Sequence, residues 1–117
     1  MELVALLGSD RESWGQVSAL LNHGTWDKII LIKNSDNADF QAPDNAEVIE
    51  INTSLPLLAL KKSIMDKLQG KFSEFEACLS IASGNGKEHM ALISALLSLP
   101  IGIRLVAFTQ NGVEFVN

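Results

Sequence analysis

The stretch that decides the fold is ACLSIASGNGKEHMALISALLS, residues 77–98. An apolar run of strand length ends at SGNGK, residues 83–87, and apolar residues then return with helical spacing. This order predicts a buried strand, a turn and an amphipathic helix. Glycines let the turn bring its backbone close to a ligand, and the free amides and dipole of a helix start favour an anion. The turn is therefore a candidate anion-binding loop.

A simpler interpretation of the same turn involves no ligand. Gly84 and Gly86 then only allow the chain to change direction, Asn85 adopts a left-handed conformation, and Lys87 is solvated. The pattern differs from the Walker loop G-x-x-x-x-G-K-S/T, and no G-x-G-x-x-G fingerprint follows the first apolar run. The absence of both motifs weakens the case for a common nucleotide-dependent enzyme, and the two interpretations of the turn stay open.

Strand and helix patterns alternate along the rest of the chain. Strands are predicted at residues 2–7, 27–34, 46–52, 76–82, 101–109 and 113–116. Helices are predicted after the first, third and fourth of these, whereas the polar segment between the second and third is too short for more than a helical turn or two. The alternation implies a mainly parallel sheet covered on both faces, and an Asn-Gly pair predicts a closing antiparallel β-hairpin. The sequence therefore predicts a single α/β domain over residues 1–117, a Rossmann-like three-layer sandwich.

The helix starts carry recognisable capping signals. Ser9 and Glu12 have the spacing of a capping box for the first helix. Thr53 or Ser54 is expected to cap the second helix, with a proline in its first turn. The third helix is expected to begin at Glu88, directly after the glycine-containing turn.

Composition limits the classes of function. Of the 117 residues, 47% are hydrophobic and 20% charged, which is typical of a globular protein with a packed core. The net charge of −5 argues against binding to duplex nucleic acid, so an anion must bind locally through backbone amides and a few cations. The single cysteine, Cys78, lies in an apolar segment and predicts a buried side chain; with two isolated histidines, a metal site has little support. No cofactor is expected.

The sequence also predicts a soluble, cytoplasmic protein that does not engage a membrane. No apolar stretch approaches the roughly 18 residues of a membrane span. The first ten residues, MELVALLGSD, do not resemble a signal peptide, because the second residue is acidic and the apolar run is short.

The candidate site lies where the predicted strands end. Ligands of open parallel sheets sit beyond the carboxyl ends of the strands, where loops lead into helices. Three loops therefore compete, and their residues are Gly8, Ser9, Asp10 and Arg11 in the first, Asn52, Thr53 and Ser54 in the second, and Ser83, Gly84, Asn85, Gly86 and Lys87 in the third.

Simpler roles exist for several of these residues. Ser9 and the 52–54 loop are explained as helix caps, with ligand contact as a second role. Asp10 and Arg11 form a surface ion pair, or Arg11 reaches a phosphate or an adenine. His89 follows Lys87 by two positions and has acid–base capacity, but a histidine that faces solvent or a dimer partner is the simpler interpretation.

Two segments resemble the CARF (CRISPR-associated Rossmann fold) domains. LSIASGNGKEHMALISALLSLPIGIRLVAF, residues 79–108, is similar to the fourth-strand motif of that family, in which a hydrophobic strand runs into a Thr-Gly-Gly-Thr-Lys-like loop and a helix. VALLGSDRESWGQVSALL, residues 4–21, followed by DKIILIKNSD, is similar to the opening of the same domains. Ser83, Gly84 and Lys87 match the family loop, whereas Asn85 and Gly86 depart from it and remove one hydroxyl.

The resemblance implies recognition of a cyclic oligoadenylate, the ring-shaped second messenger of type III CRISPR systems. It also implies a two-fold homodimer in which the ring lies across the axis, against both copies of the lysine-containing loop. A domain of this size then acts as a sensor or as a sponge that buffers the messenger. The alternatives are a metal-independent ring nuclease, with Lys87 stabilising charge in the reaction, and a structural or protein-interaction domain that binds no nucleotide.

Overall fold

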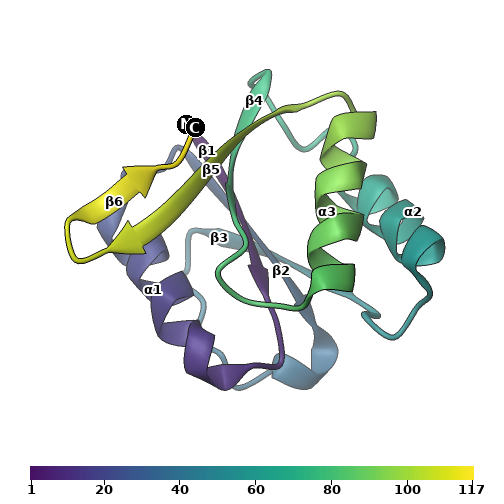
Figure 1. Cartoon of the computed structure of the whole chain (residues 1–117), viewed down its shortest axis with the longest axis horizontal. Helices are drawn as coiled ribbons and strands as arrows, with labels where there is room; N and C mark the ends of the chain where they lie inside the picture. The colour runs from purple at the N-terminus through teal and green to yellow at the C-terminus, as the bar shows by residue number, and fades with distance from the viewer.

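The computed structural model describes all 117 residues, and its centre is a six-stranded sheet (Figure 1). The strands are β1 (Glu2–Leu7), β2 (Lys28–Asn34), β3 (Ala46–Ile51), β4 (Glu76–Ser80), β5 (Gly102–Thr109) and β6 (Gly112–Phe115). They lie in the order β3-β2-β1-β4-β5-β6, and every neighbouring pair is parallel except β5 and β6. The predicted α/β, Rossmann-like fold and its closing antiparallel hairpin are thus confirmed.

Helices cover both faces of this sheet. The helices are α1 (Trp14–His23), α2 (Leu57–Leu68) and α3 (Gly86–Ser98), with short 3-10 turns η1 (Arg11–Ser13) and η2 (Ser35–Asn37). In Figure 1, α1 lies on one side of the sheet, and α2 and α3 lie together on the other. None of the helices has the length and apolar composition that a membrane crossing requires.

Strand β1 separates two apolar cores. Because successive side chains of a strand point to opposite faces, Leu3 and Leu7 pack in the core below α1, whereas Val4 and Leu6 pack in the core below α2 and α3. All six residues of β1 are buried. The carboxyl end of this strand is therefore held rigidly from both sides.

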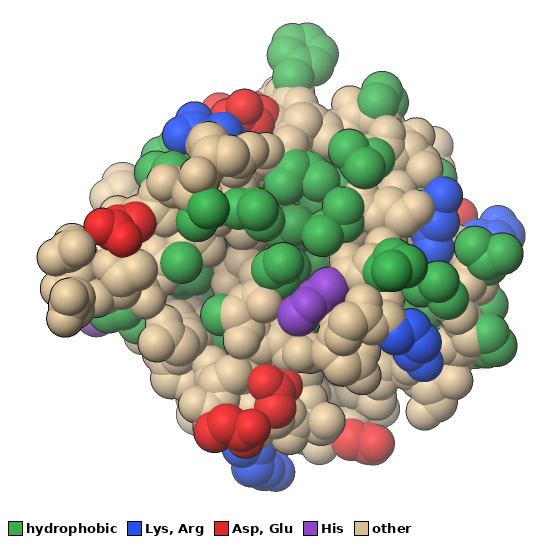
Figure 2. Space-filling view, in the orientation of Figure 1, with side chains coloured by type: hydrophobic (Ala, Val, Ile, Leu, Met, Phe, Trp, Pro, Cys, Tyr) green, Lys and Arg blue, Asp and Glu red, His purple; other side chains and the backbone are tan.

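One part of the sheet has no helix over it. Ile103 and Leu105 of β5 contact the core below α2 and α3 but stay half-exposed. Ile93 of α3 packs against the same core and is half-exposed, and Leu97, four residues further along α3, is exposed. We call these four residues the α3–β5 face, and Figure 2 shows hydrophobic side chains gathered in the centre of this side of the molecule.

Candidate functional site

The loops after β1 and β4 meet at the carboxyl edge of the sheet. These two strands are neighbours, and the chain leaves them for opposite faces, so their ends form the topological switch point at which α/β sheets bind ligands. The Gly8 amide donates a hydrogen bond of 2.8 Å to Ser83 Oγ, and the Gly84 amide donates one of 3.0 Å to Asp10 Oδ1. Sequence analysis thus identified four residues that the fold brings into direct contact across 75 positions of the chain.

The two loops approach so closely that they require glycine. A Cβ atom on Gly8 would lie 2.4 Å from the Gly84 Cα atom. Gly84 itself has a φ of +101°, and a Cβ atom there would lie 2.7 Å from Leu6 Cδ2. Gly8 and Gly84 therefore serve the packing of backbone against backbone.

Gly86 has a different environment. It does not have a positive φ, and a Cβ atom on it would meet nothing within 4 Å. The turn therefore needs Gly84 but not Gly86, and the backbone at Gly86 is open to a molecule that approaches from outside.

Helix α3 begins with a capping box that the sequence analysis did not identify. Asn85 is the N-cap, with extended backbone angles of φ −109° and ψ 176°, so the expected left-handed conformation is wrong. Its side chain accepts a hydrogen bond of 2.9 Å from the Glu88 amide, and the Glu88 side chain accepts one of the same length from the Asn85 amide. The helix consequently starts at Gly86 rather than at Glu88. The signal was visible as Asn-x-x-Glu, the capping-box spacing with asparagine in place of serine or threonine.

The capping predictions for the other two helices are wrong. The chain after Ser9 forms the 3-10 turn η1, and α1 starts only at Trp14 without a side-chain cap. Helix α2 starts at Leu57 and also lacks one. Thr53 is engaged elsewhere, because its hydroxyl accepts a hydrogen bond of 2.8 Å from the Asn34 side chain, and Ser54 donates its amide to Asn52 Oδ1 at 3.0 Å.

The first turn of α3 combines free amides with a lysine. The capping box satisfies the amides of Asn85 and Glu88, whereas those of Gly86 and Lys87 have no intrahelical partner at a helix start. The Lys87 ammonium donates a hydrogen bond of 2.9 Å to the Leu55 carbonyl, so it is not simply solvated but ties the third loop to the second. The arrangement can therefore offer an anion two amides, the helix dipole and a nearby positive charge.

At this edge, the Asp10 carboxylate already accepts the hydrogen bond of the Gly84 amide. Partial burial of Asp10 raises the pKa of its carboxyl, but hydrogen bonds from the Gly84 amide and from the Ser13 and Ser83 hydroxyls outweigh burial, and the net pKa lies below its ordinary value. Asp10 is therefore ionised near neutral pH, and it fixes the distance between the two loops. Ser83 is fully buried within the same hydrogen-bond network.

Two residues of the first loop, Arg11 and Ser9, form no hydrogen bond or ion pair with the third loop. The Arg11 guanidinium forms an ion pair with Asp39 and stacks on the Trp14 ring, 4.7 Å from its centre, so it pairs neither with Asp10 nor with the third loop. Ser9 is exposed, and its hydroxyl makes no hydrogen bond within the chain.

Sequence analysis also missed the positioning role of Asn37. This buried side chain donates hydrogen bonds to the carbonyls of Leu7 and Gly8, at 3.4 and 3.2 Å, and so holds the end of β1 from the side of β2. No local pattern marks it, since it belongs to a polar segment with several similar residues.

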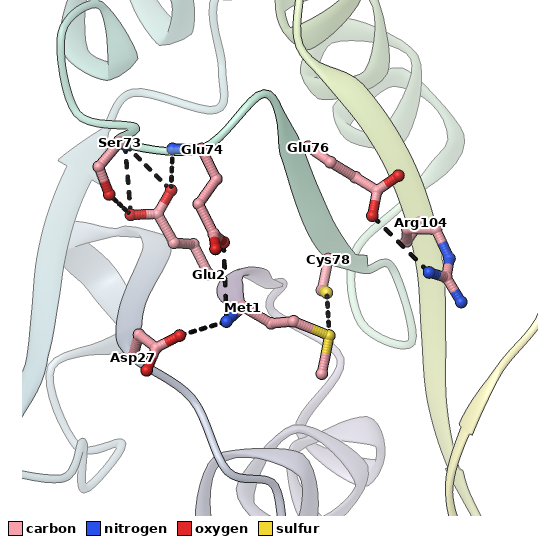
Figure 3. Close-up of polar contacts among 8 residues, drawn as sticks. All are labelled: Met1, Glu2, Asp27, Ser73, Glu74, Glu76, Cys78 and Arg104. Atoms are coloured by element: carbon pink, nitrogen blue, oxygen red, sulfur yellow. Dashed lines mark hydrogen bonds and ion pairs between the residues drawn. The ribbon is translucent and has the colours of Figure 1, made fainter.

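The opposite, amino-terminal edge of the sheet carries a second polar cluster (Figure 3). Glu2 accepts hydrogen bonds from the Ser73 amide and hydroxyl and from the Glu74 amide, and the amino group of Met1 pairs with Asp27. The polar groups of this cluster satisfy one another's hydrogen-bonding capacity. Burial raises the pKa of the neighbouring Cys78 thiol, as expected of an unreactive packing residue.

No group of three or more histidine, cysteine, aspartate or glutamate side chains is arranged to hold a metal ion. Comparison with known protein families, with curated proteins and with solved structures finds no match to this chain.

Proposed function

We propose that this chain binds a cyclic oligoadenylate at the carboxyl edge of its sheet, as a cytoplasmic homodimer that senses or buffers the messenger in a type III CRISPR response. The observation that carries the proposal is the start of α3. There, an unhindered Gly86, two free amides and Lys87 lie at the switch point of the sheet. Backbone amides at a helix start bind phosphate without requiring a basic protein surface, which suits a chain of net charge −5.

The position of the α3–β5 face supports the homodimer. Residues 86, 89, 93 and 97 follow one another at helical spacings of three and four, so Gly86 stands at the head of a stripe that continues through His89, Ile93 and Leu97. A two-fold axis that runs along α3 at this stripe would bring two α3 starts to the same side of the dimer. A ring that carries several phosphates is then matched by a symmetric pair of anion sites.

The residues divide their roles in this proposal. Gly86 and Lys87 contact phosphate through their amides, and the Lys87 ammonium exchanges the Leu55 carbonyl for a phosphate oxygen. Gly8, Asp10, Ser83 and Gly84 hold the loops in register. Ser9, Asn52 and Thr53 lie in the loops that border the edge and contact the sugars or bases, whereas Arg11, held by Asp39, contributes only if that pair opens.

A ring nuclease is the second candidate, and one observation favours it. His89 Nε2 lies 2.8 Å from the Ser83 carbonyl, and because a carbonyl only accepts hydrogen bonds, Nε2 carries the proton. The Nδ1 lone pair of the neutral ring is then free to accept a proton from a ribose hydroxyl. An interaction domain without a nucleotide ligand is the third candidate, and it predicts neither binding nor cleavage.

Thermal unfolding in the presence of candidate ligands tests the proposal. A ligand at a hundred times its dissociation constant adds roughly 2.7 kcal/mol to the free energy of unfolding, a rise in melting temperature on the order of ten degrees. Cyclic tetra-adenylate or hexa-adenylate should produce this rise, and linear oligoadenylate, ATP and NAD much less. Analysis of the recovered ligand separates intact ring from linear products. No rise with either ring, or an equal rise with ATP, would contradict the proposal.

A matched pair of lysine variants locates the site. Lys87→Ala should lower the affinity for the ring at least about tenfold, because a charge-assisted hydrogen bond contributes 1.5–3 kcal/mol in typical cases. Lys62→Ala is the control, since Lys62 is an exposed lysine on α2 that pairs with Asp66. Equal affinities for the two variants would remove Lys87 from the site.

A further inference from the structure

A polar cavity opens at the carboxyl ends of β2 and β3, and no residue of α3 lines it. It has a volume of about 690 Å³, and eight of its nine lining residues are polar: Asn34, Ser35, Asp36, Glu50, Asn52, Ser54, Ser63 and Lys67, with Ile51 as the ninth. Cavities between 300 and 1,000 Å³ typically hold small organic ligands. Helix α2 supplies one wall, and the two strand ends supply the other.

The charges of this cavity exclude several classes of ligand. Asp36 and Glu50 are the acidic residues of the lining, and Lys67 is the basic one. The Lys67 ammonium donates a hydrogen bond of 2.6 Å to the Glu50 carbonyl, whereas the Glu50 carboxylate forms an ion pair with Lys33 at 3.6 Å. Asp36 is then the carboxylate without a partner, and it would repel a phosphate or carboxylate ligand. A divalent metal would lack a third strong ligand, and an apolar ligand would contact only Ile51. A neutral molecule with many hydroxyl groups fits the lining best.

The hydrogen bonds within the lining show which groups remain for such a molecule. Asn34 Nδ2 is used by Thr53, and Asn52 Oδ1 is used by the Ser54 amide, so the Asn52 amide group is left as a donor. The Asp36 carboxylate forms no ion pair or hydrogen bond within the chain, and the Ser63 hydroxyl likewise has no partner. One unpaired carboxylate therefore stands among neutral donors and acceptors whose backbone is already fixed by the strand ends.

We infer that this cavity binds the vicinal diol of a sugar ring, with Asp36 as the principal contact. Two adjacent ring hydroxyls each donate one hydrogen bond to a carboxylate, and the carboxylate has two oxygens to receive them. The Asn52 amide and the Ser63 hydroxyl complete the shell around the ring. In doubly wound sheets a carboxylate that follows the second strand holds ribose hydroxyls in the same way. The inference does not depend on the phosphate site at α3.

A titration followed by the amide chemical shifts of the whole chain tests the inference. The probes are adenosine, methyl ribofuranoside and dideoxyadenosine, which lacks both ring hydroxyls; none carries a phosphate. Adenosine should move the signals of residues 34–36 and 50–54, and dideoxyadenosine should not. If methyl ribofuranoside also binds, a free sugar is sufficient for binding. If only adenosine binds, the ligand is a nucleoside.

Two aspartate variants complete the test. Asp36→Asn should weaken adenosine binding about tenfold, because one charge-assisted hydrogen bond becomes a neutral one or is lost. Asp66→Asn is the control, since Asp66 is an exposed carboxylate on α2 outside the cavity. Absence of shifts at millimolar adenosine, equal binding of dideoxyadenosine, or equal affinity of the two variants would overturn the inference. Because no probe carries a phosphate, these outcomes do not test the contacts proposed for phosphate at the start of α3, and failure here is distinguishable from failure there.

Discussion

Gly84 and Gly86 lie two residues apart, but the fold requires glycine only at the first of these positions. Gly84 has a positive φ and lies against Leu6, whereas Gly86 is unconstrained. Gly84→Ala should lower the free energy of unfolding by at least about 2 kcal/mol, because it combines a left-handed backbone with a steric clash. Gly86→Ala should leave it unchanged or raise it by up to about 1 kcal/mol, because alanine favours the helix. Chemical denaturation of both variants measures the contrast, and equal destabilisation would contradict it.

The same pair of glycines also tests ligand contact at the level of one atom. If phosphate approaches the Gly86 amide, the added methyl group of Gly86→Ala should weaken binding of the cyclic ligand while the fold stays intact. A variant that melts normally and binds normally would show that no ligand approaches there.

Asp10 gives the carboxyl edge a defined dependence on pH. Its pKa is lowered in the folded chain from an ordinary value of 3.8. A lowered pKa means that ionised Asp10 stabilises the fold above the unfolded value and that this contribution disappears as the pH falls through the folded value. The difference in unfolding free energy between the parent and Asp10→Asn should therefore shrink below pH 3.8. A difference that stays constant from neutral pH into this range would contradict the role of the ionised side chain.

For single residues, the sequence predicted which ones lie close together but not which hydrogen bonds join them. Gly8, Asp10, Ser83 and Gly84 were all expected near one site because each follows a strand of a parallel sheet. Their mutual hydrogen bonds were not predictable, since these depend on the close approach of two loops that lie 75 positions apart in the chain. The ion pair expected between Asp10 and Arg11 was wrong for the same reason, because the partner of Arg11, Asp39, belongs to another loop.

Secondary-structure elements were predicted better at their centres than at their starts. All six strands were predicted, with boundaries that differ by one or two residues for most of them, because their apolar runs are set by burial on both faces. Helix starts depend on a single side chain, and that side chain has competing partners. Thr53 bonds Asn34 across two strands instead of capping α2, and no local pattern records that competition.

The cap of α3 permits a direct test at the level of the element. Asn85→Ala should lower the free energy of unfolding by about 1 kcal/mol, since it removes the hydrogen bond to the Glu88 amide and half of the capping box. Ser9→Ala should have little effect, because Ser9 caps no helix. Thermal unfolding of the two variants distinguishes the observed Asn85 cap from the predicted Ser9 cap. A larger loss of stability for Ser9→Ala would contradict the structure.

For the molecule as a whole, the α3–β5 face bears on the proposed homodimer. Leu97 is 61% exposed, so Leu97→Glu should preserve the monomer fold and disrupt a dimer that uses this face. Phe75→Glu is the control, because Phe75 is an apolar side chain that is 95% exposed and lies outside this face. Light scattering across a range of concentrations measures the result. A parent chain that is monomeric with and without cyclic ligand would rule out the dimer.

The order of the strands also governs when the molecule can fold during synthesis. Strand β1 pairs with β2, and β2 with β3, as soon as these strands leave the ribosome, but the other neighbour of β1, β4, emerges only after α2. Until then, one edge of the most deeply buried strand has unpaired backbone groups and uncovered leucine side chains. A nascent chain that stalls before Glu76 is therefore exposed to edge-to-edge association. The duration of this exposure depends on how quickly translation delivers β4.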